Sequence, residues 1–312
     1  RVDRFDSRVH TGRVGAAGVS AYRVDNHMLW PACFVALEED YRHLKSAVQI
    51  WDVACERQVE ITGPDAFHLI QLMTPRDMSR QHIGQCTYAP ICDEAGRILN
   101  DPVVLKLSED RFWVSIADSD ILLFAKGLAI GMGLAVTVHE PDVSPLAVQG
   151  PQADLLMERA FGHTVHRIGF FKFARLAFAG MSLIVARSGY SGQGGFEIYV
   201  EGTENGMPLW NALMEAGADL NVRAGCPNLV ERVESGLLSY GNDMTSDNNP
   251  LECGLGNYVS DNQLDTCFGG RALRELREAG GPKQQIRAVA IEGDLPACDR
   301  AWDAFVDGKH VG

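Results

Sequence analysis

Apolar residues follow strand and helix periods in two similar stretches of the chain. In segment 59–70 a strand pattern is followed by a Gly-Pro turn at 63–64 and then by a helix with proline at its first position. The same order returns 87 residues later in segment 146–156, with its Gly-Pro turn at 150–151. We therefore predict that the two segments are copies of one unit and that the fold has two related αβ halves.

Further strands and helices are predicted between and after these units. Two β-rich runs at 101–107 and 111–117 are joined by a short polar turn, which is typical of a hairpin. Apolar runs at 181–186 and 196–200 predict two more strands on either side of a glycine-rich loop. Helical spacing of apolar residues predicts helices at 207–216, 227–240 and 272–279.

The longest apolar stretch, 121–136, is interrupted by Lys126 and three glycines. It predicts a buried helix that runs into a loop, because it is too short and too broken to span a bilayer. A new β pattern starts at 288–291, and the chain ends within it. We expect one folded unit over residues 1–285 and the start of a second, truncated domain over residues 286–312.

Composition and charge favour a protein with a substantial core and reduced thiols, and they argue against nucleic-acid partners. Of the 312 residues, 46% are hydrophobic, which is enough for a substantial core, and 41 Asp and Glu against 28 Lys and Arg give a net charge of −13. A negative surface repels polyanions, so no nucleic-acid partner is expected. The eight cysteines form no C-x-x-C or histidine-spaced pair, which favours reduced thiols. No apolar leader is visible, so we expect a cytoplasmic protein without membrane contact.

Common catalytic motifs do not fit the chain. The glycine-rich loop at 189–195 runs into a strand, so it offers no helix N-terminus to a phosphate. A near match to a nucleophile elbow has Gln193 in place of the last glycine. The nine histidines include no H-x-H or H-E-x-x-H pair. No metal is expected, and His163 and His166 are interpreted as surface or loop residues.

A carboxylate on a strand is the first candidate for binding chemistry. Glu197 follows Gly194 and Gly195, and it shares one face of its strand with Tyr199. The two glycines would let a flat molecule approach the strand closely. The alternative interpretation is that this face is an exposed sheet edge.

Five segments in a fixed order resemble the folate-binding aminomethyltransferase family, which includes the T-protein of glycine cleavage. They read N-H-M-L-W-P at 26–31, W-D-V-A at 51–54, D-E-A-G-R-I-L-N-D at 93–101, R-S-G-Y-S-G with G-F-E-I-Y within 187–199, and R-V-E-S-G-L with Y-G within 232–241. The resemblance implies an α+β fold of two ferredoxin-like units and a C-terminal β-barrel around a tetrahydrofolate site. It would explain the repeat and a truncated barrel over 286–312.

The chain departs from the aminomethyltransferases at positions that carry their chemistry. The turn that reads Asp-Asp in that family reads Asn100-Asp101 here, and an asparagine can neither carry the negative charge nor take a proton. Asn228 stands where the family has arginine. Glu197, which holds the pterin ring in the family, is retained, and a carboxylate can accept two N–H groups of a pterin. This pattern resembles the group of dimethylsulfoniopropionate demethylases, with W-D-V-A-C-E-R-Q-V-E-I at 51–61 and C-P-N-L-V-E-R at 226–232.

The resemblance to this group implies transfer of a methyl from a small sulfonium substrate, dimethylsulfoniopropionate, to N5 of tetrahydrofolate. The sulfonium leaves as a neutral thioether, so positioning and electron-rich rings matter more than acid catalysis. Asn100 and Tyr199 are expected to act in catalysis. For Arg187 the alternative is a salt bridge to Glu60 or Glu234. Expected cofactor contacts are Glu197, Tyr88, Asp101, Ser115 and Arg187, and expected substrate contacts are Tyr190, Tyr199 and Trp30.

Other functions stay open at this stage. A related folate-dependent O-demethylase would need an acid for its ether oxygen, and no such residue stands out. The glycine-cleavage aminomethyltransferase is disfavoured by Asn100 and Asn228. Non-catalytic folate-binding proteins of iron–sulfur cluster maintenance carry a cysteine in the loop that corresponds to 188–194, which has none here. A homodimer is left open.

Overall fold

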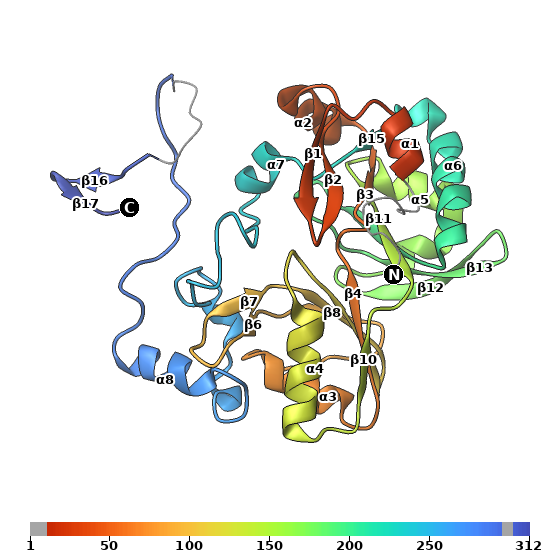
Figure 1. Ribbon diagram of the computed structural model, residues 1–312. Coiled ribbons are helices and arrows are strands. Elements are labelled where there is room, and N and C mark those ends of the chain that lie inside the picture. Colours follow the sequence, from red (N-terminus) through yellow and green to blue (C-terminus); the bar gives the residue numbers. More distant parts are fainter. Residues whose placement is uncertain (1–10, 295–301) are drawn as a thin grey trace.

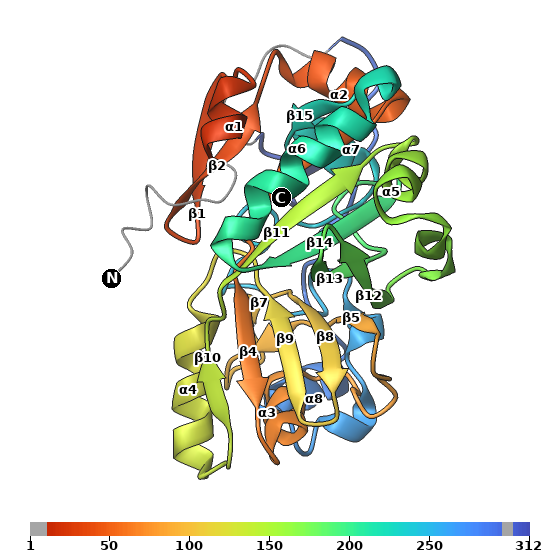
Figure 2. The ribbon, with the colours of Figure 1, turned by 90° about the vertical axis from the view of Figure 1, so that its right-hand side faces the viewer.

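The computed structural model describes residues 11–294 and 302–312, and two sheets with helices on their outer faces form its body (Figure 1, Figure 2). The larger sheet has the order β12-β13-β14-β11-β3-β15, in which β15 runs parallel to β3 and the other pairs are antiparallel. Helices α5 (Ala153–Phe161) and α6 (Gly206–Ala216) pack on it through a shared apolar core. Its strands are β3 (Gln49–Asp52), β11 (Val143–Gln149), β12 (Phe173–Phe178), β13 (Met181–Ala186), β14 (Gly195–Glu201) and β15 (Arg223–Gly225).

The smaller sheet is antiparallel and has the order β10-β4-β9-β8-β5. Helices α3 (Ala66–Met73) and α4 (Ile121–Met132) bury their apolar sides against it, with Leu69 and Phe112 in the common core. The hairpin predicted at 101–107 and 111–117 is β8–β9, and it is confirmed. The strands are β4 (Gln58–Thr62), β5 (Cys86–Tyr88), β8 (Val103–Ser108), β9 (Arg111–Ser115) and β10 (Thr137–His139).

The two predicted Gly-Pro turns have the same local structure. Gly63 and Gly150 have φ angles of 129° and 125°, a region that favours glycine. A Cβ on Gly63 would lie 2.4 Å from the carbonyl oxygen of Ala135, and one on Gly150 would lie 2.4 Å from that of Ala47. In both copies the glycine therefore lets a neighbouring backbone segment pass directly under the turn, which supports the predicted repeat.

The two sheets meet through a small apolar cluster. Tyr199 of β14 contacts Trp113 of β9 with ring centroids 5.9 Å apart, and Cys86, Leu105 and Ile184 complete the contact. The inner face of β14 thereby turns toward the smaller sheet. This junction fixes the position of the candidate site.

The remaining elements are short and lie around this body. They are α1 (Thr11–Ala16), β1 (Ala21–Asp25), β2 (Met28–Cys33), α2 (Leu37–Ser46), β6 (Ile91–Cys92), β7 (Ile98–Asn100), η1 (His163–Arg167), η2 (Thr203–Asn205), η3 (Ala218–Leu220), α7 (Leu229–Glu234), η4 (Gly256–Tyr258), η5 (Asp261–Gln263), α8 (Gly270–Glu278), β16 (Phe305–Val306) and β17 (Lys309–His310).

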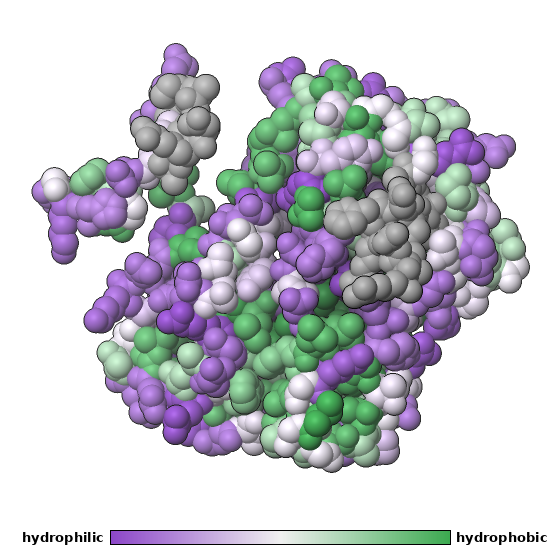
Figure 3. All heavy atoms as spheres, viewed as in Figure 1, coloured by the Kyte–Doolittle hydropathy of each residue, from purple (hydrophilic) through white to green (hydrophobic). Residues whose placement is uncertain are grey.

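Two helix predictions need correction. The helix predicted at 227–240 ends at Glu234, because Gly236 has a φ of 69° and the N–H of Leu237 returns to the carbonyl of Arg232 at 2.8 Å, as in a Schellman motif. The stretch 121–136 forms α4 followed by a loop, but it is not buried all round. Leu123 and Ile130 are exposed, and apolar atoms gather over this part of the surface in Figure 3.

The C-terminal segment leaves the body after α8 and ends in the hairpin β16–β17 (Figure 1). The strand predicted at 288–291 is irregular, because its backbone has no neighbouring strand to pair with among the described residues. The truncated barrel predicted over 286–312 stays a prediction, and part of it, 295–301, lies outside the described residues. None of the helices in 11–294 and 302–312 combines the length and apolar character needed to cross a bilayer.

Candidate functional site

The inner face of β14 carries the carboxylate that the sequence singles out. Glu197 is 9% exposed, and its Oε2 accepts a hydrogen bond from the hydroxyl of Ser188. Burial raises the pKa of Glu197, and the bond from Ser188 opposes part of that rise. A buried carboxyl held by a neutral hydroxyl retains acceptor capacity for N–H donors of a ligand.

A second carboxyl, Glu56, interacts electrostatically with Glu197, and no sequence motif points to it. Glu56 lies in the loop between β3 and β4. Burial raises its pKa well above the ordinary range, and the negative charges of Glu197 and Asp25 raise it further. Because neighbouring buried carboxyls oppose each other's ionisation, the pair holds a proton to higher pH than an isolated carboxyl would.

Tyr199 lies on the same face as Glu197 and is almost completely buried. Ser115 hydrogen-bonds the Tyr199 side chain, and the Ser115 Oγ also accepts a 2.9 Å hydrogen bond from Nε2 of Gln58. Burial and the charge of Glu197 raise the pKa of Tyr199 well above its ordinary value. The phenol therefore stays protonated at neutral pH and can act as a hydrogen-bond partner, not as a base.

Asp101 is the second acidic centre of the site. The hydroxyl of Tyr88 donates a 3.0 Å hydrogen bond to its Oδ2, and the ring of Tyr88 meets Tyr258 edge-on at 5.0 Å. Burial raises the pKa of Asp101 to about 7, while the bond from Tyr88 acts in the opposite direction. The charge of Asp101 also raises the pKa of Tyr190 and of Tyr240. Burial is the larger cause of the raised pKa of both residues, and Tyr88 is the tyrosine that bonds the Asp101 carboxyl directly.

Asn100 is fully buried, and its amide holds the chain segment that follows β9. Its Nδ2 donates to the carbonyl of Ala117 at 3.1 Å and to Oγ of Ser119 at 2.7 Å. Its Oδ1 accepts from the N–H of Ala117 at 3.2 Å. The amide thus fixes the loop next to Asp101. Its expected part in catalysis stays a prediction.

Tyr190 and Trp30, both expected at the substrate, pack in one cluster with Trp51. The hydroxyl of Tyr190 donates a 2.7 Å hydrogen bond to the carbonyl of Leu238. The guanidinium of Arg23 lies 3.9 Å from the ring centroid of Trp30, so a cation of the protein itself already covers one ring face. Their contact with substrate stays a prediction.

Arg187 points to the other side of the larger sheet. Its Nη2 donates to Oδ2 of Asp154 on α5 at 2.9 Å, and its guanidinium lies 5.0 Å from the ring of Phe196. The alternative partners named from the sequence were wrong, because Glu60 binds Arg111 and Trp113 while Glu234 binds Lys45 and Tyr41. Cofactor binding by Arg187 stays a prediction, and the structure does not bring its side chain to β14's inner face.

Three residues with a role in the electrostatics or hydrogen bonding of this site were missed from the sequence. Glu56 stands beside Arg57, which suggests a local ion pair, yet Arg57 bonds Glu140 in the structure. Ser188, in the loop between β13 and β14, and Gln58, the first residue of β4, belong to no motif of their own. Gln58 lies opposite Ser115 in the pairing of β4 with β9. The sequence could have pointed to Gln58 only through this register, which one sequence does not reveal.

The fold and this arrangement define a class of protein. The family model described as the GCVT N-terminal domain matches residues 11–263, so the chain belongs to the GCVT family. The chain is 59% identical over 299 residues to dimethylsulfoniopropionate demethylase DmdA of Ruegeria pomeroyi, which covers 96% of this chain and 81% of that protein. It is 31% identical to an aminomethyltransferase of Bacillus cereus, over 90% of this chain and 78% of that protein.

A solved structure supports the fold. The glycine cleavage system aminomethyltransferase T of Bartonella henselae superposes with a TM-score of 0.78 at 23% identity, over 88% of this chain and 75% of that chain. The family resemblance and the α+β aminomethyltransferase fold expected from the sequence motifs are thereby confirmed.

Proposed function

We propose that the chain is a tetrahydrofolate-dependent demethylase. It transfers a methyl group from dimethylsulfoniopropionate to N5 of tetrahydrofolate and forms 5-methyltetrahydrofolate and 3-methylmercaptopropionate. The observation that carries the proposal is the 59% identity, over 96% of the chain, to a protein named for this demethylation.

Two hydrogen-bond acceptors, one on β14 and one on β4, fit a pterin. Glu197 retains acceptor capacity in a buried position, and Oε1 of Gln58 is buried with no hydrogen-bond partner among the described residues. Such groups match a ligand that presents N–H donors from a flat ring. Bound there, tetrahydrofolate would supply the N5 lone pair that takes the methyl.

Acidic and aromatic side chains suit a small sulfonium cation. The Glu56–Glu197 pair can keep one negative charge while it holds a proton, and Asp101, with a pKa of about 7, is ionised in part of the molecules at neutral pH. The rings of Tyr190 and Tyr199 add electron-rich faces, each worth about 0.5–2 kcal/mol to a cation. These faces attract the methyl donor without offering a strong nucleophile that would compete for the methyl group.

The reaction depends on the alignment of the methyl donor and acceptor more than on proton transfer. A sulfonium loses its methyl as a neutral thioether, so the leaving sulfur needs no acid, and a Tyr199 that stays protonated does not obstruct the step. Holding donor and acceptor about 3 Å apart in line can contribute several powers of ten in rate. The rigid junction between the two sheets would provide that alignment.

The test is to incubate the protein with tetrahydrofolate and dimethylsulfoniopropionate and to measure 5-methyltetrahydrofolate. Parallel reactions replace the sulfonium by an aryl methyl ether, or by aminomethyl donors of glycine cleavage. Product from the sulfonium alone supports the proposal. Product from an aryl methyl ether with none from the sulfonium would replace it by an O-demethylase.

A cytoplasmic location and a homodimer belong to the same proposal. Fractionation of the source cells tests the location, and light scattering of the purified protein tests the homodimer. A monomer mass at working concentration would contradict the proposed homodimer and would leave the proposed reaction unaffected.

A further inference from the structure

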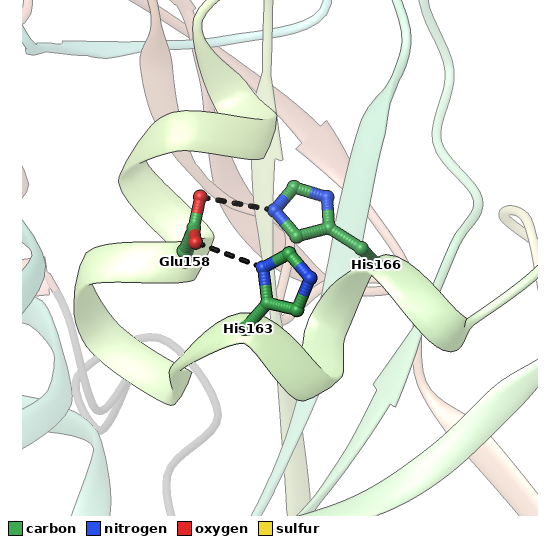
Figure 4. A group of neighbouring side chains, drawn as sticks. All are labelled: Glu158, His163 and His166. Carbon is green, nitrogen blue, oxygen red and sulfur yellow. Dashed lines mark hydrogen bonds and ion pairs between the residues drawn. The ribbon is translucent and has the colours of Figure 1, made fainter.

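Two histidines and a glutamate converge on the outer side of α5. Glu158 lies on α5, and His163 and His166 lie on the short helix η1 that follows it (Figure 4). Nδ1 of His163 is 3.1 Å from Oε1 of Glu158, and Nε2 of His166 is 3.0 Å from Oε2. One donor atom from each of the three residues lies within 4.8 Å of the other two.

The backbone holds these side chains in place. Gly162 has a φ of 77°, and its N–H bonds the carbonyl of Glu158 at 2.7 Å, so the chain turns back at the end of α5. In a 3₁₀ helix, residues three apart lie on one face, which brings His163 and His166 together. Val165 between them is fully buried in the core and fixes the orientation of η1.

We propose that Glu158, His163 and His166 form a binding site for a divalent transition-metal ion of the Zn²⁺ or Cu²⁺ type. Two imidazole nitrogens and one carboxylate are ligands that these ions prefer. Ligand atoms on a tetrahedral Zn²⁺ lie about 3.3 Å apart, given bonds of about 2.0–2.1 Å. The 3.1 and 3.0 Å separations run to different oxygens of Glu158, and one ligand atom from each of the three residues lies within 4.8 Å of the other two. The side chains therefore have to close on the ion by up to about 1.5 Å, which rotation of the two exposed histidine side chains allows.

Binding would exchange a proton for the metal. Nδ1 of His163 and Nε2 of His166 would each give a lone pair to the ion, and any proton on those atoms would move to the other ring nitrogen or leave to solvent. Three protein ligands leave a coordination position for water. Both histidines are partly or largely exposed, with side-chain exposures of 82% and 33%, so the ion can reach them.

The site is separate from the proposed methyl-transfer site. It lies beside α5, whereas Glu197 and Tyr199 lie on the face of β14 that meets the smaller sheet. The metal would tie the end of α5 to η1, and we expect it to stabilise this half of the fold without a part in the reaction. The proposal is therefore independent of the proposed function.

The cysteines do not compete strongly for the ion. None of the seven described cysteines is in a disulfide with another described residue, and Cys298 lies outside the described residues. Burial raises the pKa of Cys226 and Cys253 to about 12 and that of Cys267 to about 11, so these thiols stay protonated. Cys33 is the more accessible thiol, with intermediate exposure.

The experiment titrates tag-free protein with Zn²⁺ in a calorimeter. We expect one ion per chain, and binding weakened roughly 100-fold in His163→Gln and in His166→Gln. His139→Gln is the matched control, because His139 also pairs with a glutamate, Glu60 at 3.4 Å, but has no second histidine in that pair. Its binding should equal that of the wild type.

Electron paramagnetic resonance with Cu²⁺ identifies the ligands. Splitting from two nitrogens in the wild type, reduced to one in either variant, supports the site. Wild-type protein that binds no Zn²⁺, or a binding constant unchanged in both histidine variants, overturns the proposal. A sulfur-dominated Cu²⁺ spectrum would also overturn it.

Discussion

The hydroxyl of Tyr88 donates a 3.0 Å hydrogen bond to Oδ2 of Asp101, a buried carboxyl whose pKa is about 7. The bond favours the ionised form, so its removal in Tyr88→Phe raises the pKa of Asp101 further. If ionised Asp101 attracts the sulfonium, kcat/KM for that substrate falls on the acidic side of this pKa. We expect the acidic limb of the pH profile to move up by about one pH unit in Tyr88→Phe.

Tyr240→Phe is the control for that shift. Tyr240 also senses the charge of Asp101, but its hydroxyl bonds the carbonyl of Ile98. Its profile should keep the wild-type midpoint. An unmoved midpoint in Tyr88→Phe would contradict the role given to the hydrogen bond.

Asp101 also makes stability depend on pH. Its pKa in the folded state, about 7, exceeds the ordinary value of 3.8, so the folded state binds more protons between these values and loses stability as pH rises through that window. Asp101→Asn should therefore be more stable than the wild type at pH 8, by at most about 4 kcal/mol, with the gain vanishing below about pH 4. Urea unfolding at both pH values measures the difference, and a variant that is less stable at pH 8 would refute the sign.

Glu197→Gln tests the binding of the pterin. Loss of a charged acceptor for N–H donors should weaken tetrahydrofolate binding by about 1.5–3 kcal/mol, or roughly 10- to 150-fold, as measured by calorimetry. The control is Glu201→Gln on the same strand, where Glu201 pairs with Arg175 at 2.8 Å outside the site. Equal affinities of the two variants for tetrahydrofolate would show that Glu197 does not bind this ligand.

Asn100→Asp and Ser119→Ala together distinguish the effect of an added negative charge from the effect of a lost hydrogen bond. A carboxylate cannot donate to the carbonyl of Ala117, so the variant should lose about 1–3 kcal/mol of unfolding free energy together with demethylation rate. Ser119→Ala removes one bond to the same amide without adding charge. If both variants slow the reaction equally, Asn100 acts by holding the loop. If Asn100→Asp alone is slow, the added charge is the cause, and an unchanged rate would refute any role in catalysis.

A glycine of the repeated turn and a glycine inside α4 predict opposite effects of the same substitution. Gly150→Ala places a Cβ 2.4 Å from the Ala47 carbonyl oxygen at a φ of 125°, so we expect a loss of more than about 2 kcal/mol. Gly127→Ala, inside α4 with open space around it, should instead gain about 0.5–1 kcal/mol. Thermal unfolding measures both, and equal effects would contradict the packing described for Gly150.

Much of the fold could be predicted because it depends on residues that are close together in the sequence. Alternation predicts β8, β9, β13 and β14, and the Gly-Pro turns mark both repeated units. Two elements differ from the prediction for different reasons. The helix after Pro227 ends at Glu234 for a local reason, the left-handed conformation of Gly236, whereas 288–291 is irregular because a strand needs a partner that its own residues cannot reveal.

The structure brings several predicted site residues to the junction of the two sheets. Glu197 and Tyr199 lie on β14 of the larger sheet and Ser115 lies on β9 of the smaller sheet, and their part in binding stays a prediction. Glu56 could not be predicted, because its burial and the charge of Glu197 beside it arise from the tertiary packing of the chain. Arg187, expected at the cofactor, directly follows β13 and pairs with Asp154 on α5, on the opposite face of the larger sheet.

The most direct measurement follows the methyl group itself. Dimethylsulfoniopropionate labelled with ¹³C in its S-methyl groups is incubated with tetrahydrofolate and the protein, and carbon NMR monitors the label. We expect the label to appear on N5 of 5-methyltetrahydrofolate with the wild type and with Glu201→Gln, and to appear much more slowly with Glu197→Gln. Label that stays on sulfur with the folded wild-type protein would contradict the proposed function.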